Sequence, residues 1–296
     1  MSVAEMLTQL NPTPCVVAEN VVMRYRVPST EVPQDTRYPH LKFLRALNPL
    51  PNTVTVHALN ELSLVVNRGE SVGVIGRNGS GKSTLMKLVS GQIRPSSGAI
   101  HASSTPIMLG VNAALVPELS GDQNVVLGCL AMGLSHEEIA TRFDEIVEVS
   151  GLEKSIHLPM KSYSSGMGSR LRFAIAACAN PEILLVDEAL NTGDAQFAAR
   201  SKQRMDELRS QAGCVLLVSH SLTTIKEMTS RTIWLDKGDL IMDGPSKDVT
   251  QEYMKFTKEL SKGNNISAQR LRSEAIASLD AVNVINTARR SLRGGR

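Results

Sequence analysis

The stretch Gly76-Arg77-Asn78-Gly79-Ser80-Gly81-Lys82-Ser83 is a complete G-x-x-x-x-G-K-S phosphate loop. An apolar run at 70–75 (ESVGVI) precedes it and predicts a buried strand, and the apolar spacing of 84–90 (TLMKLVS) predicts a helix after it. In this context the backbone N–H groups of the loop and the helix N-terminus point at a polyphosphate. We expect the whole loop and Thr84 to bind a nucleotide, with Lys82 reaching the β- and γ-phosphates and the Ser83 hydroxyl holding Mg²⁺.

Length and composition indicate an ordinary globular protein of one large or two small domains, with 296 residues, 42% of them hydrophobic and 21% charged. No apolar run approaches the ~20 residues that span a bilayer. The first 15 residues lack the basic start and apolar core of a secretory signal, so we expect the chain to stay in the cytosol.

The net charge of +3 conceals an uneven distribution, because residues 261–296 carry seven Lys and Arg against two acidic residues. The rest of the chain is mildly acidic, which argues against nucleic acid as a partner. For the basic tail, a solvated and partly disordered segment is favoured over contact with an acidic lipid surface. The tail also carries apolar residues at helical spacing, which predict a face packed on the body: Ala268, Leu271, Ala275, Leu279, Val282 and Ile285.

The order of apolar patterns predicts a β-rich N-terminal part. Residues 16–27 and 54–66 read as strands, and another strand is expected near Ile100. Between the first two, 28–53 contains five prolines and is interpreted as an insertion, in which only 40–47 has the pattern of a short amphipathic helix.

The second half of the chain alternates helical and strand patterns. The pattern is helical over 117–158, and strands and helices then alternate to about Gly244, closing with a hairpin at Lys237-Gly238. This alternation predicts a parallel sheet with helices on its faces.

Polar residues follow two of the predicted strands. The apolar run 183–186 ends in Asp187-Glu188, and 215–220 (VLLVSH) ends in His220. Paired acids after a strand can simply cap a helix, but 105 residues after a phosphate loop they favour catalysis, with Asp187 on Mg²⁺ and Glu188 accepting a proton from an attacking water. A lone histidine is more often structural, although His220 at a strand end can also bond the γ-phosphate and hold the base and water in register.

A second small-residue segment, 161–169 (KSYSSGMGS), precedes the helical pattern at 170–179. By itself it is either an ordinary helix cap or an anion site at a helix N-terminus. Its position 23 residues before Asp187, counted from Ser164, favours the anion site.

These four elements, in this order, resemble the nucleotide-binding subunits of ABC transporters over about residues 16–250. The matching segments are Walker A at Gly76–Ser83, an LSGGQ-type signature at 163–167 (YSSGM), Walker B with its glutamate at 183–188, the D-loop at 189–194 and the switch histidine at His220. The resemblance implies an α/β P-loop NTPase of ABC type. Its mainly parallel core sheet would be flanked by helices, with an antiparallel β subdomain and a helical subdomain at 117–165.

The resemblance also implies a nucleotide-binding domain over 1–250, followed by a basic tail at 251–296 that is partly helical or disordered. It implies a head-to-tail homodimer with two ATP at the interface, working on a separate integral-membrane permease at the cytoplasmic face of the membrane. Lys82, Ser83 and Asp187 of one copy would face the signature residues Ser164, Ser165 and Gly166 of the other. Catalysis would rest on Glu188, His220 and Lys82.

Variant forms of the motifs resemble one branch of the family, the ATPases that drive export of lipid-linked polysaccharides such as O-antigen, teichoic acid, capsule or galactan. They are YSSGM, VDEALNTGD, the proline-rich insertion and PELSGDQNV at 117–125. Teichoic acid and O-antigen or galactan stay open as cargo. A soluble ABC ATPase of DNA repair or translation and a non-catalytic regulatory cassette are the alternatives, and an intact Glu188 and His220 count against the second.

Two positions depart from the family pattern. Residues 107–117 contain no Q-loop glutamine and Gln123 lies too far along, so another residue or a backbone carbonyl supplies the metal contact, or the loop serves to dock the permease. The adenine-stacking aromatic is expected to be Tyr25, at the end of the first strand, with His57 as the alternative.

Overall fold

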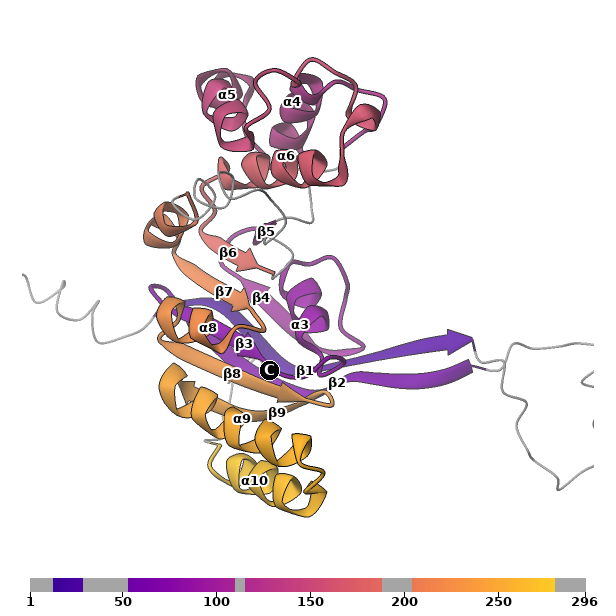
Figure 1. Ribbon diagram of the computed structural model, residues 1–296, viewed down its shortest axis with the longest axis vertical. Coiled ribbons are helices and arrows are strands. Elements are labelled where there is room, and N and C mark those ends of the chain that lie inside the picture. The colour runs from indigo at the N-terminus through magenta and orange to yellow at the C-terminus, as the bar shows by residue number, and fades with distance from the viewer. Residues whose placement is uncertain (1–12, 29–52, 110–114, 188–203, 280–296) are drawn as a thin grey trace, which may run out of the picture.

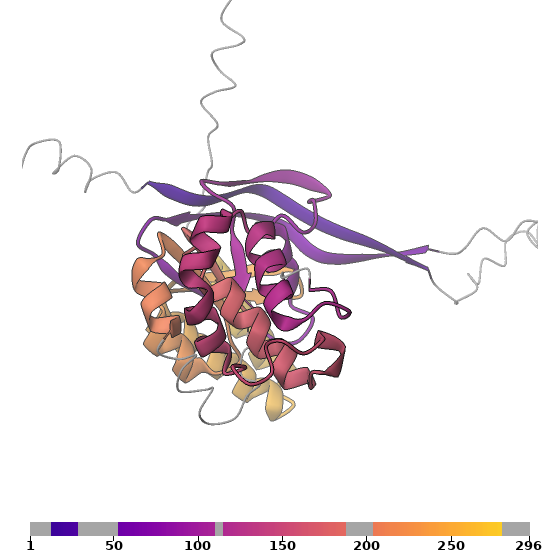
Figure 2. The ribbon, with the colours of Figure 1, turned by 90° about the horizontal axis from the view of Figure 1, so that it is seen from above.

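The computed structural model describes residues 13–28, 53–109, 115–187 and 204–279 (Figures 1 and 2). These residues form two sheets, one of three strands in the order β2-β1-β4 and one of six strands in the order β5-β6-β7-β3-β8-β9. The insertion expected at 28–53 lies outside the described residues, apart from its two end positions.

The three-stranded sheet is antiparallel, as β1 (Pro14–Pro28) pairs with both β2 (Thr53–Asn67) and β4 (Ser97–Ala102). The three strands predicted in this part of the sequence are therefore confirmed. One face of the sheet is apolar and joins the core, while the paired far ends of β1 and β2 extend beyond the body (Figures 1 and 2).

The six-stranded sheet is parallel except for its last strand, which agrees with the predicted fold class. Its strands are β3 (Ser71–Ile75), β5 (Ile107–Leu109), β6 (Ile183–Val186), β7 (Cys214–Val218), β8 (Arg231–Asp236) and β9 (Asp239–Pro245). Every residue of β6 and β7 is buried, because central parallel strands are covered on both faces. The predicted hairpin at Lys237-Gly238 joins β8 to β9 and is confirmed.

A helical layer with its own apolar core lies at one end of the molecule (Figure 1). It consists of α4 (Gly121–Ala131), α5 (His136–Ser150), the 3-10 turn η1 (Met160–Ser162) and α6 (Ser165–Ala177). The layer continues past the limit expected at residue 165, because Leu171 and Ile175 of α6 pack into the same core as Val125 and Ile146.

The remaining helices are α3 (Lys82–Val89), α8 (Leu222–Met228), α9 (Ser246–Ser261) and α10 (Asn265–Ala277). The boundary expected at residue 250 falls inside α9, which crosses it because Val249 and Phe256 are both buried in the core beside the sheet. Ala268 and Ala275 of α10 are also buried there, as expected for the apolar tail face, whereas Val282 and Ile285 lie outside the described residues. Among the residues that the structure describes, no helix is long and apolar enough to cross a membrane.

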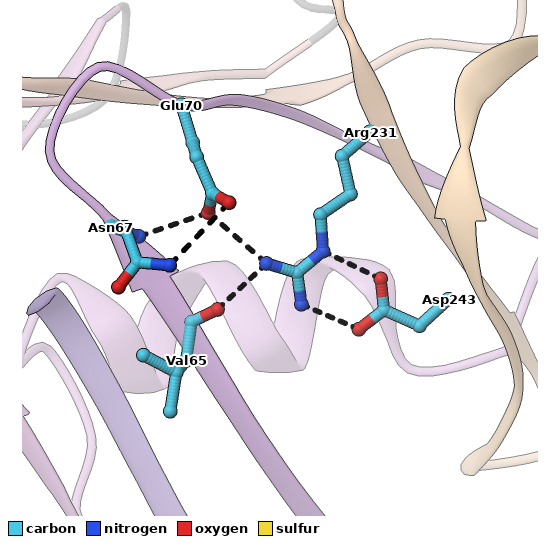
Figure 3. Close-up of polar contacts among 5 residues, drawn as sticks. All are labelled: Val65, Asn67, Glu70, Arg231 and Asp243. Carbon is cyan, nitrogen blue, oxygen red and sulfur yellow. Dashed lines mark hydrogen bonds and ion pairs between the residues drawn. The ribbon is translucent and has the colours of Figure 1, made fainter. Parts of the chain in front are cut away.

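Arg231, the first residue of β8, links the two sheets (Figure 3). Its guanidinium donates from Nε and Nη2 to the two carboxylate oxygens of Asp243 on β9, both at 2.6 Å. Nη1 donates to Oε2 of Glu70 at 3.0 Å and to the carbonyl of Val65 on β2 at 2.8 Å. The hydrogen bonds that Arg231 donates to Asp243 raise the pKa of Arg231 despite burial. This cluster holds the N-terminal ends of β3 and β8 against the antiparallel sheet.

Replacing Arg231 with methionine should lower the free energy of unfolding by about 2–4 kcal/mol, because it removes the cation that neutralises two partly buried carboxylates. Urea denaturation of the full chain measures this. The matched control is Arg270→Met, since the Arg270–Glu274 pair on α10 is exposed on both sides and contributes little. Equal stability of the two variants would contradict the linking role of Arg231.

Candidate functional site

The phosphate loop is shaped by glycines that approach other backbone segments closely. Gly76 has φ 153°, and a Cβ there would lie 2.2 Å from the carbonyl oxygen of Leu235 at the end of β8. Gly81 has φ 107°, and a Cβ there would lie 2.7 Å from the carbonyl oxygen of Ala58 on β2. Only glycine fits at these two positions, so the loop runs between β8 and β2.

Lys82, the first residue of α3, points back along the loop and is only 7% exposed. Its Nζ donates to the carbonyls of Gly76 at 2.6 Å and Arg77 at 3.1 Å. The helix has Gly81 as its N-cap, without a side-chain cap, so no side chain of the cap occupies the N–H groups of the first turn. A polyanion is the partner that such a loop and helix start can bind.

Three predicted site segments come together at one edge of the sheet. β6, β7 and β3 are parallel neighbours, and their registers pair Val186 with Leu217 and Val74 with Val218. Asp187, the segment 219–220 and Gly76 therefore follow their strands at the same carboxyl edge, where α/β sheets bind ligands. Asp187 is half-buried and His220 is exposed.

The donor set at this edge fits a hard divalent cation such as Mg²⁺, which prefers oxygen ligands. The Ser83 hydroxyl is exposed in the first turn of α3, and the Asp187 carboxylate follows β6. Glu188 and the D-loop segment 189–194, also predicted for this site, lie outside the described residues.

The signature segment is in a different layer of the molecule from the phosphate loop. Ser164 is the N-cap of α6, and its Oγ accepts a hydrogen bond from the N–H of Met167 at 3.2 Å. Ser164 and Ser165 are exposed, and a Cβ on Gly166 would meet only the Ser164 hydroxyl, at 3.9 Å. Figure 1 shows α6 in the helical layer and α3 beside the sheet. Within one chain, the start of α6 is therefore exposed at the surface.

Tyr163, which precedes the signature serines, belongs to the scaffold. Its hydroxyl donates to the carbonyl of Ser155 at 2.7 Å, and a Cβ on Gly121 would lie 2.2 Å from it. Burial and the nearby Asp122 carboxylate raise the pKa of Tyr163. The phenol ties the start of α6 to the segment at Ser155 and packs closely against the start of α4.

Gln123 has a structural role in the helical layer. Its side-chain oxygen accepts from the N–H of Ser120 at 3.1 Å and completes a capping box at the start of α4. This agrees with its exclusion as a Q-loop residue, while residues 110–114 lie outside the described part of the chain.

Tyr25 and His57, the two candidates for stacking on adenine, lie on opposite faces of the β1–β2 ribbon. Tyr25 pairs with Val56 and His57 with Arg24, and directly opposed residues of an antiparallel pair share a face. Tyr25 is half-buried against the core, and His57 is exposed. Only one of the two side chains can face a given nucleotide, and Tyr25 stays the predicted one.

The contact of the β8–β9 turn with the phosphate loop was missed by the sequence reasoning. The N–H of Gly238 donates to the carbonyl of Ser80 at 3.0 Å, and Leu235 lies against Gly76. The sequence contains a signal for the turn itself, Lys237-Gly238, but its partner lies more than 150 residues earlier. Nothing local in the sequence connects the two.

Comparison with known proteins agrees with this geometry. The family model described as "ABC transporter" matches residues 59–191. The teichoic acids export ATP-binding protein of Staphylococcus saprophyticus is 35% identical over 230 residues, which are 78% of this chain and 87% of that protein. The chain belongs to the ATP-binding proteins of the ABC transporter family. Its phosphate loop and Walker B strand lie inside the matched region, and His220 lies beyond it.

Other relatives of this ABC protein are longer than the chain. The teichoic acids export ATP-binding protein of Lactococcus lactis is 40% identical over 69% of this chain but only 44% of its own length. The O-antigen export system ATP-binding protein of Myxococcus xanthus is 36% identical over 72% of this chain and 49% of its own length. The chain thus spans less than half of the first curated relatives that it matches.

A solved ATP-binding cassette shows the same fold. Its structure, a dimeric post-hydrolysis state bound to ADP and Pi, superposes with a TM-score of 0.60 at 21% identity, covering 78% of this chain and 98% of that one. The ABC-type P-loop fold predicted from the sequence is confirmed.

Gly76→Ala should lower the free energy of unfolding by about 3 kcal/mol or more, because the new Cβ collides with the Leu235 carbonyl and the loop must move. The control is Gly79→Ala, where φ is also positive (77°) but nothing lies within 4 Å of the Cβ, so only the left-handed backbone cost of about 1 kcal/mol applies. Urea unfolding without nucleotide compares them. Equal losses of stability would show that the backbone conformation, and not the close approach to the Leu235 carbonyl, is what requires glycine at position 76.

Proposed function

We propose that the chain is the ATP-hydrolysing subunit of an exporter. Two copies bind ATP between them and drive a separate integral-membrane permease that moves a lipid-linked polysaccharide across the cytoplasmic membrane. One observation carries the proposal. The phosphate loop, Asp187 and His220 share one sheet edge, while the capped and exposed start of α6 lies in another layer, available to a second copy.

Each residue at the edge has a role in this proposal. The loop N–H groups and Lys82 hold the phosphates, and Ser83 with Asp187 hold Mg²⁺, which supplies charge neutralisation on the phosphate oxygens. Glu188 orients or deprotonates the attacking water, and His220 keeps the γ-phosphate and the base in register. Tyr25 stacks on the adenine.

The homodimer is proposed because the phosphate-loop site of one chain does not include the signature residues, which lie in another layer. Ser164, Ser165 and Gly166 of the second copy would donate to the γ-phosphate held by the first, so that ATP is a ligand shared by both. Its cleavage removes that shared ligand, the dimer opens, and the permease moves with it. The dimeric form of the solved cassette, at low sequence identity, supports this arrangement by analogy of fold only.

The relatives' names support a cell-surface polymer as the cargo. They include teichoic acids export and O-antigen export. The ATPase would sit peripherally at the cytoplasmic face and would bind no nucleic acid. Co-purification from detergent-solubilised membranes with a multi-span protein tests the permease partnership, and recovery of the chain without such a protein would contradict it.

Glu188→Gln should lower ATP turnover by 100-fold or more while leaving ATP affinity within about threefold of the parent, because the amide still bonds water but takes no proton. With turnover blocked, ATP and Mg²⁺ should convert the chain to a stable dimer. Steady-state phosphate release and analytical ultracentrifugation measure the two effects.

The matched control is Glu182→Gln, the same substitution just before β6, at the end of that strand away from Asp187. Glu182 pairs with Arg68 at the surface, so turnover should stay at the parental rate. A Glu188→Gln variant that hydrolyses ATP normally, or that remains monomeric with ATP, would refute the proposed base or the proposed dimer.

A further inference from the structure

The C-terminal helix hairpin, α9 and α10, lies against β8 and β9 at the end of the molecule opposite the helical layer (Figure 1). Trp234 of β8 anchors it, with ring centroids 5.0 Å from Phe256 and 5.5 Å from Tyr253 of α9. Ala268 and Ala275 fix α10 in the same core. Both helices are therefore held in a defined position beside the strand that ends at the phosphate loop.

Arg272 of α10 reaches from this hairpin to the turn between β8 and β9. Its Nε donates to Oδ2 of Asp236 at 3.1 Å, and its Nη2 donates to Oδ2 of Asp239 at 2.5 Å. The Asp236 side chain is only 4% exposed and that of Asp239 39%. One guanidinium thus neutralises two carboxylates, one of which is buried.

The turn needs this neutralisation for two reasons. Asp236 and Asp239 are directly opposed across the hairpin, and like charges in that position repel. The two residues between them have positive φ, 51° at Lys237 and 85° at Gly238, and the left-handed conformation is unfavourable for the lysine. Arg272 offsets this repulsion by binding both carboxylates, and so links the two ends of the strained turn.

The β8–β9 turn is also hydrogen-bonded to the phosphate loop and to β2. The Gly238 N–H donates to the Ser80 carbonyl at 3.0 Å, and the Asn60 N–H donates to the Gly238 carbonyl at 2.9 Å. The Asn60 side chain donates to Oδ1 of Asp239 at 2.6 Å. Asp239 therefore joins Arg272 to the strand that encloses Gly81.

We propose that Arg272 is a positioning residue for nucleotide binding, acting through the β8–β9 turn on the backbone of the phosphate loop. It holds the turn so that the Gly238–Ser80 hydrogen bond and the close approach of Leu235 to Gly76 persist. It also cancels the negative charge of two carboxylates that would otherwise oppose the binding of phosphates nearby. The inference rests on the proposed binding of ATP by this loop.

The test measures affinity of the full chain for a non-hydrolysable ATP analogue with Mg²⁺ by calorimetry. Arg272→Met should weaken binding about tenfold, more at low salt than at high salt because an uncompensated charge is screened. Arg272→Met with Asp236→Asn should recover most of that loss, since the buried charge is gone. Arg270→Met, on the same helix with an exposed partner, should bind like the parent.

Recovery by Asp236→Asn attributes the loss of affinity to the unpaired carboxylate, and urea unfolding of the same variants shows that each is folded under the conditions of the binding measurement, which excludes a general loss of structure. Arg272→Lys replaces Arg272→Met if the latter does not fold; lysine keeps the charge but not the planar fork, so about threefold weaker binding is expected. Parental affinity in the folded single variant, or a loss that Asp236→Asn leaves unchanged, overturns the inference. If the parent chain binds no nucleotide, both the proposed function and this inference fail. If the parent binds nucleotide and Arg272→Met binds it with equal affinity, only the inference fails.

Discussion

The close approach of Gly76 to the carbonyl of Leu235 is the constraint on which the site depends. It brings the phosphate loop against the end of β8, where any side chain would collide. The loop then turns past β2 at Gly81, and Lys82 closes it by bonding its own carbonyls. The shape that receives a polyanion is thus made by packing of the loop backbone between β8 and β2, and its stability depends on the position of these strands.

The sheet supplies two further conditions. Because β6, β7 and β3 are adjacent and parallel, Asp187, His220 and the phosphate loop emerge at one edge without any special contact between them. At the other end of β3 and β8, Arg231 binds Asp243 of β9 in its own sheet, Glu70 in the turn between β2 and β3, and Val65 of the antiparallel sheet, and so fastens the two sheets together. The part of β2 from Asn60 to Val65 is therefore held at two points, by Arg231 at Val65 and by the β8–β9 turn at Asn60.

Much of this could be predicted from the sequence, because the signals are local. The apolar run before Asp187 predicted a strand, and the G-x-x-x-x-G-K-S pattern at 76–83 predicted the phosphate loop. What could not be predicted depends on long-range pairing. No pattern near Lys237-Gly238 indicates Ser80 as its partner, and the boundary expected at 250 ignored that Val249 and Phe256 bury on one continuous helix. Tyr163, expected within an anion-binding signature, proved to tie the start of α6 to the segment at Ser155.

The helical layer and the C-terminal hairpin differ in how they are connected to the sheet edge that carries the phosphate loop. The helical layer carries its own core and presents the capped start of α6 as an exposed surface, which in the proposed dimer would contribute to the site of the second copy. The C-terminal hairpin shares its core with the sheet and reaches the phosphate loop through Arg272 and one turn of backbone hydrogen bonds. A shift of the hairpin would therefore be transmitted to the loop directly, whereas in the proposed dimer a shift of the helical layer would change the site of the second copy. In that proposal, the fold separates the elements that hold the nucleotide within one chain from those that couple one chain to the next.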